Sequence, residues 1–144
     1  MVAMRTMSRD EAWGFLGAGV RTAKLATTRD DGAPDVVPVW FVLDGDQIVF
    51  TCPGSSLKAR NLVRDPRAAV AVDDEAFPHA FVTVRGTVEV AVRPGDLGVW
   101  TTRIAARYVG AERAEEYGRR NEQIDDCLVR LTAERILARA DVAL

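Results

Sequence analysis

The first 92 residues contain a series of short β-branched or alternating segments, and the short connections between the early ones limit the folds open to the chain. The turn sequences "DDGAP" and "DGDQ" separate the first three segments. Parallel strands need crossover connections of a dozen or more residues, whereas connections this short join antiparallel strands. The sequence therefore predicts a mainly β protein with helices (α+β), built on an antiparallel barrel and not on a parallel sheet. The predicted strands are residues 21–29, 35–43, 48–52, 67–72 and 80–92.

Helical patterns flank and interrupt these strands. Ser8 begins a capping-box motif, which predicts a short first helix. Apolar residues at helical spacing over residues 94–108 predict a longer helix, and a charged segment after Gly110 predicts another. The tail, residues 127–140, resembles two last strands, which brings the expected total to about six or seven. Because no repeat or linker pattern occurs, we expect residues 1–144 to form one domain.

The predicted strand at residues 35–43 is apolar on both faces. One face can fill a barrel, whereas the other needs cover from a helix of the same chain or from a second subunit, and we expect a homodimer. Pro38 cannot donate a ladder hydrogen bond, which predicts an edge strand or a bulge. Pro38 and Trp40 could form a flat apolar wall for a ring system, although these residues alone favour ordinary core packing. Gly86, in the middle of a later strand, predicts a bulge or a close backbone approach.

Charge and cysteine content argue against several classes of function. Nineteen basic and 21 acidic residues give a formal net charge of -2, so no global positive field would attract nucleic acid or an anionic membrane. Cys52 and Cys127 form no CxxC pair and do not adjoin the single histidine, which argues against a zinc site or a disulfide framework. No apolar run approaches the ~20 residues of a membrane span, and no signal-peptide pattern occurs. We therefore expect a cytoplasmic protein without a metal site, a nucleic-acid partner or a membrane partner.

Residues 51–72, "TCPGSSLKARNLVRDPRAAVAV", pass from strand to turn to cationic helix and back to strand. The Pro-Gly turn brings Ser55 or Ser56 to the N-cap of that helix. Helical spacing predicts one buried face and one outward polar face. The predicted buried face holds Ala59, Leu62 and Val63, and the outward face holds Lys58 and Asn61.

The charges at the start of this helix are unusual. A helix N-terminus carries about half a positive charge and favours acidic neighbours, yet Lys58 lies in its first turn and Arg60 follows closely. A bound phosphate would supply the missing negative charge through backbone N–H groups, serine hydroxyls and the lysine. A solvated basic helix with a serine cap explains the same pattern, so spacing alone leaves the two interpretations about even.

Other candidate residues have ordinary structural explanations. His79 lies where a loop meets a strand and is expected to be exposed and not catalytic. The glycines of "GFLGAGV" do not have dinucleotide-binding spacing. The segment "ERAEEYGRRNE" reads as a solvated helix face, although Arg119 and Arg120 could border an anionic ligand. No catalytic residue emerges from the sequence.

Three segments together resemble the pyridoxamine-phosphate-oxidase-like family of flavin and deazaflavin enzymes. They are "LATTRDDGAPDVVPVWFV", "SSLKARNLVRDPRAAVAVDDE" and "RYVGAERAEEYGRRN". The resemblance covers about residues 20–137 and is nearest to the actinobacterial branch that uses the deazaflavin F420. It implies a split antiparallel β-barrel of the FMN-binding type, forming a homodimer with a cofactor site at each subunit junction.

The resemblance also implies which residues bind the cofactor. Its phosphate cradle corresponds to Lys58 and the hydroxyls of Ser55 and Ser56, with Thr51 alongside and Arg60 and Asn61 completing the element. Its ring would lie against the backbone of Val37, Pro38, Val39 and Trp40. Leu57 stands where pyridoxamine phosphate oxidases have an arginine, which weakens an FMN reading.

The function implied is that of an F420-dependent oxidoreductase that transfers a hydride between the deazaflavin and a small organic substrate. The cofactor would carry the chemistry, which agrees with the lack of a visible acid-base pair. Two alternatives stay open: an FMN-dependent oxidase or reductase, and a non-catalytic protein that binds flavin, deazaflavin or haem. The sequence identifies neither the substrate nor the proton donor.

Overall fold

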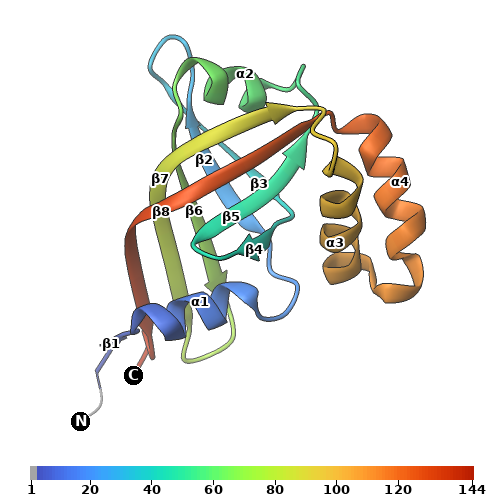
Figure 1. The fold of residues 1–144 in the computed structure, drawn as a ribbon. Helices are drawn as coiled ribbons and strands as arrows, with labels where there is room; N and C mark the ends of the chain where they lie inside the picture. Colours follow the sequence, from blue (N-terminus) through green and yellow to red (C-terminus); the bar gives the residue numbers. More distant parts are fainter. Residues whose placement is uncertain (1–2) are drawn as a thin grey trace.

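The computed structural model describes residues 3–144, and a curved antiparallel sheet dominates it (Figure 1). The sheet has eight strands in the order β3-β2-β6-β7-β8-β5-β4, with β1 pairing to β8, and every pairing is antiparallel. This confirms the predicted split-barrel fold. The strands are β1 (Arg5–Thr6), β2 (Ala23–Thr28), β3 (Pro34–Val39), β4 (Val42–Asp44), β5 (Gln47–Cys52), β6 (Arg67–Asp74), β7 (Ala80–Val92) and β8 (Cys127–Ala140).

Within residues 3–144, four α-helices and one 3-10 turn pack around the sheet. The predicted capping box is confirmed, because the Ser8 hydroxyl accepts a hydrogen bond from the Glu11 N–H at the start of α1. Gly110 has a φ of 91° and separates α3 from the turn that leads into α4. The helical pair α3 and α4 lies beside β4 and β5 (Figure 1). The helices are α1 (Arg9–Gly17), α2 (Leu57–Arg64), α3 (Leu97–Val109), η1 (Ala111–Arg113) and α4 (Ala114–Ile124).

Two apolar clusters stabilise this arrangement. The larger one fills the inside of the curved sheet, and its fully buried side chains include Phe41, Phe50 and Leu25. The smaller one lies between α3 and the strands β4, β5 and β8, where Trp100 and Ile104 pack against Val42. A helix of the same chain therefore covers part of the second apolar face predicted for residues 35–43. Val36 on β3 remains 63% exposed.

The prediction of one strand at residues 35–43 was wrong, because the chain breaks between β3 and β4. The Phe41 N–H donates to the Tyr108 hydroxyl at 3.2 Å, and the Phe41 carbonyl accepts from Arg107 Nη1 at 2.9 Å. Side chains of α3 thus replace the ladder partners that a continuous strand would need. The prediction for Pro38 is confirmed, because β3 is an edge strand of the sheet.

The prediction of two strands in the tail was also wrong, since β8 is continuous. Its register with β7 shifts at Arg85 and Gly86, so that Glu134 is the extra residue of a bulge. The bulge bends the long strand without a turn. The predicted close approach at Gly86 is confirmed, because a Cβ atom there would overlap the Thr132 carbonyl oxygen.

Helix α2 buries a different set of residues from the predicted one. Ala59 and Leu62 are buried as expected, but Val63 is 71% exposed. Asn61 is 1% exposed and donates from Nδ2 to the Thr27 hydroxyl at 3.0 Å. The outward position predicted for Asn61 is therefore wrong, because a partner on β2 satisfies its amide inside the protein.

Candidate functional site

A cavity of about 300 Å³ lies where the ends of β3 and β5 meet the start of α2 and the helical pair α3–α4. One side of this cavity is apolar and the other is polar. Residues from β3, β5, α2 and the helical pair α3–α4 together form its wall. The lining residues are Pro38, Val39, Trp40, Thr51, Cys52, Pro53, Lys58, Ile104, Asn121 and Asp125.

The apolar side of the cavity is formed around Trp40. Its ring stacks on Tyr108 with centroids 5.0 Å apart and an interplanar angle of 9°. The Tyr108 hydroxyl donates to the Arg21 carbonyl at 2.9 Å while it accepts from Phe41, so the stack is held in place. Trp40 is 38% exposed, which contradicts the core-packing interpretation and leaves an open aromatic edge at the cavity.

The polar side of the cavity combines a carboxylate with an ammonium group. The Thr51 hydroxyl donates to Asp125 Oδ2 at 2.8 Å. Burial raises the pKa of Asp125, while the Thr51 hydrogen bond and the nearby positive charge of Lys58 lower it. No carboxylate of residues 3–144 lies within 4 Å of the Lys58 ammonium. Lys58 is therefore able to bind an incoming anion.

The start of α2 provides further donors. Ser56 is the N-cap, and its hydroxyl accepts from the Ala59 N–H while donating to the Pro53 carbonyl. The N–H groups of Leu57 and Lys58 have no acceptor within residues 3–144.

The sequence predicts that the start of α2 has no acidic neighbours. This prediction is correct only for residues of the helix itself. The first turn of α2 contains no acidic residue. However, Asp126 accepts a hydrogen bond from the Gly54 N–H, which lowers the pKa of that carboxyl, and Asp125 lies in the adjoining cavity. The segment between α4 and β8 therefore supplies negative charge that the local sequence does not show.

Half of the ten predicted cofactor-binding residues meet in this cavity: Pro38, Val39, Trp40, Thr51 and Lys58. The other five do not line it. Val37 packs toward the main core, Ser55 is exposed in the preceding turn, and Ser56 is used as the cap. Arg60 borders a separate hollow with Val63 and Arg64, and Asn61 is buried against β2.

Residues 11–140 match the family profile described as "Pyridoxamine 5'-phosphate oxidase". The chain belongs to this family. No curated protein sequence matches the chain.

Several solved structures are similar to the chain over most of its length. The conserved hypothetical protein Rv2991 from Mycobacterium tuberculosis is 26% identical, with 94% of this chain and 86% of that chain covered and a TM-score of 0.80. A protein described as an F420 reductase is 28% identical, with 82% and 90% covered and a TM-score of 0.64. An FAD-binding protein from Mesorhizobium loti is 20% identical, with 96% and 98% covered and a TM-score of 0.72, which supports the fold alone.

The sequence does not single out two polar residues that line this cavity, Asn121 and Asp125. It places Tyr108, which stacks on Trp40 beside the cavity, only at helical spacing in the predicted helix. The one available signal was the pair of acidic residues directly before the last strand, "DDCLV". Nothing in the local sequence indicates that Asp125 meets Thr51, which lies 74 residues earlier.

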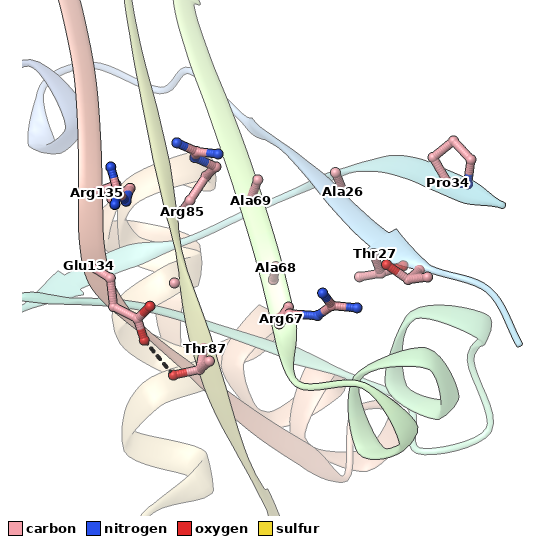
Figure 2. A pocket seen from close by; sticks show the side chains of 12 residues that line it. Ala26, Thr27, Pro34, Arg67, Ala68, Ala69, Arg85, Thr87, Glu134 and Arg135 are labelled. Atoms are coloured by element: carbon pink, nitrogen blue, oxygen red, sulfur yellow. Dashed lines mark hydrogen bonds between the residues drawn. The ribbon is translucent and has the colours of Figure 1, made fainter. Parts of the chain in front are cut away.

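A second hollow, of about 470 Å³, lies on the outer face of the sheet (Figure 2). Its floor carries small side chains such as Ala26 and Ala69. Arg85 and Arg135 project from directly paired positions of β7 and β8, and neither has an ion-pair partner within residues 3–144. The Thr87 hydroxyl donates to Glu134 at 2.8 Å on the same face.

Residues 3–144 contain no helix that is long and apolar enough to cross a membrane. They also contain no group of three or more His, Cys, Asp or Glu side chains placed to hold a metal ion. His79 is exposed in a loop, as expected.

Proposed function

We propose that this protein is an F420-dependent oxidoreductase that transfers a hydride between the deazaflavin and a small organic substrate. The observation that carries the proposal is that one cavity is lined by an open aromatic wall, Trp40, and by the ammonium group of Lys58, which has no ion-pair partner among residues 3–144. A ring with an anionic tail fits that combination. The similarity to an F420 reductase and the presence of Leu57 in place of the arginine of pyridoxamine phosphate oxidases support F420 over FMN.

The residues present suit such a cofactor. Pro38 and Trp40 would lie against the ring, and the Tyr108 stack would keep Trp40 in one orientation. Lys58 and the free N–H groups at the start of α2 would hold the phosphate, and Ser55, exposed in the preceding turn outside the cavity, could reach only a part of the ligand that extends beyond it. When bound, the deazaflavin supplies or accepts the hydride, and the protein's contribution is to orient it and to exclude water.

FMN is the second candidate cofactor, because the profile that matches the chain is described as pyridoxamine 5'-phosphate oxidase and the family it resembles includes flavin enzymes. The two proposals predict different relative affinities. The first predicts that F420 binds more tightly than FMN, and the second predicts the reverse. Titrating the purified protein with F420 and with FMN, followed by oxidation of reduced F420 with a panel of acceptors, decides between them. Tight binding without turnover of any acceptor would instead favour a storage or carrier protein.

Replacing Lys58 by alanine is expected to weaken F420 binding by about tenfold or more, because a charge-assisted hydrogen bond contributes about 1.5–3 kcal/mol. The matched control is Arg60→Ala, which removes the same charge from the same helix but outside the cavity. Fluorescence titration measures both affinities. Unchanged F420 affinity in Lys58→Ala, or an equal loss in Arg60→Ala, would contradict the proposed cradle.

We also propose that the protein forms a homodimer through the outer face of β2, β6 and β7. Small side chains such as Ala26 and Ala69 leave a shallow hollow at the centre of this face (Figure 2). Val36 on the edge strand β3 is exposed. Ala69→Arg would place a long charged side chain at that centre and is expected to convert a dimer to a monomer in light scattering. Ala111→Arg, on the exposed turn before α4, is the control and is expected to remain dimeric. A monomeric wild-type protein would refute the proposal.

A further inference from the structure

The cavity contains a carboxylate where a phosphate-binding site would be expected to have only donors and cations. Asp125 enters the cavity from the segment between α4 and β8 and accepts the Thr51 hydroxyl at 2.8 Å. The resemblance assigned Thr51 to the phosphate cradle, yet its proton is already donated to this carboxylate. Lys58 is the only basic residue among those that line the cavity.

The charge balance of the cavity therefore limits the charge of the phosphate group that binds beside Asp125. One ammonium and one carboxylate leave the lining with no net positive charge. Asp125 is half-buried, and repulsion between charges is stronger where water is partly excluded. Burial raises the pKa of this carboxyl, whereas the Thr51 hydrogen bond and the positive charge of Lys58 lower it.

Ligand phosphates differ in charge according to how they are esterified. A phosphomonoester has a second pKa of about 6 and carries about -1.5 to -2 at pH 7. A phosphodiester lacks that second ionisation and carries a single negative charge. FMN ends in a phosphomonoester, whereas the phosphate of F420 is a diester.

We propose that Asp125 is a specificity-determining residue that selects a phosphodiester-bearing cofactor over a phosphomonoester. Its carboxylate repels the second charge of a monoester, while Lys58 neutralises the single charge of a diester. The inference rests on the proposed function, because it concerns the same cavity. It gives a structural reason for discrimination between F420 and FMN that does not depend on the ring.

The test compares three ligands that share one ring: the ribityl form without phosphate, its 5′-phosphate and the methyl ester of that phosphate. The set is prepared with both the flavin and the deazaflavin ring, and dissociation constants are measured at pH 7.5. For the wild-type protein we expect the methyl ester to bind at least about tenfold more tightly than the monoester. For Asp125→Asn we expect the monoester to gain about tenfold in affinity and the phosphate-free ligand to change by less than about twofold.

Asp125→Asn keeps an oxygen that accepts from Thr51, so the change removes charge and preserves the hydrogen bond. Asp30→Asn, an exposed position in the turn between β2 and β3, is the matched control and should leave all three affinities unchanged. Asp125→Ser is a second variant that should show the same gain if the asparagine protein does not fold.

The outcomes separate the inference from the proposed function. The wild-type and Asp125→Asn proteins could bind all three ligands with the same ratio of methyl-ester affinity to monoester affinity. That result would overturn the inference and leave the proposed function standing. Unchanged affinities together with loss of turnover in Asp125→Asn would also overturn it, because the carboxyl would then act in the reaction and not in selection. A wild-type protein that binds none of the ligands and no F420 overturns the proposed function and the inference with it.

Discussion

Replacing Arg107 by alanine is expected to lower the free energy of unfolding by about 3 kcal/mol and to weaken cofactor binding at the same time. The guanidinium donates to the carbonyls of Leu16, Gly19 and Phe41 at 2.7, 3.0 and 2.9 Å, and thereby ties α3 to the end of α1 and to the break between β3 and β4. Hydrogen bonds from a charged group contribute about 1.5–3 kcal/mol each, and this half-buried side chain makes several.

The loss should reach the cavity because the Phe41 carbonyl follows directly after Trp40. Urea denaturation measures the stability, and fluorescence titration measures F420 affinity. Arg103→Ala, one turn earlier on α3, is the control: its Nη2 lies 3.5 Å from the Leu43 carbonyl, at the limit for a hydrogen bond, and the side chain is exposed. A cost below about 1 kcal/mol is expected there. Equal losses in the two variants would contradict the role assigned to Arg107.

Gly86→Ala is expected to lower the free energy of unfolding by about 3 kcal/mol, at the upper end of the range for overpacking substitutions. A Cβ atom at this position would overlap the Thr132 carbonyl oxygen of β8, and Leu131 also lies within contact distance. Because the obstacle is the backbone of a paired strand, the sheet must shift at the bulge to accept the methyl group.

The control for this prediction is Gly14→Ala in α1. A Cβ atom there meets nothing within 4 Å, and alanine is favoured over glycine inside a helix by about 0.5–1 kcal/mol, so the midpoint of thermal unfolding should rise. A Gly86→Ala protein that is as stable as the wild type would show that the strand pair can separate freely at the bulge.

Features set by neighbouring residues could be predicted from the sequence. The hairpins β2–β3 and β4–β5 follow from alternating segments and turn sequences, and the first helix follows from its capping box at Ser8. The N-cap of α2 and the close approach at Gly86 were predicted for the same reason, since turn geometry and the lack of a Cβ are local properties.

The site could be predicted only in part. The resemblance pointed to Trp40, Thr51 and Lys58, which do line one cavity. It also pointed to Asn61, whose amide the structure uses to bind Thr27, and to Arg60, which faces another hollow. Helical spacing predicts the direction in which a side chain points from its own helix. The partner in that direction belongs to a different element, which the spacing does not identify.

The sequence by itself determined the antiparallel architecture, the position of the cationic helix and the family to which the chain belongs. Tertiary structure alone decided that the strand after Pro38 breaks at Phe41 and that Asp125 meets Thr51 beside Lys58. The physical reason is the same in both cases. The partners lie 67 and 74 residues apart along the chain, and only packing of α3, α4 and β8 against the barrel brings their polar groups within hydrogen-bonding distance.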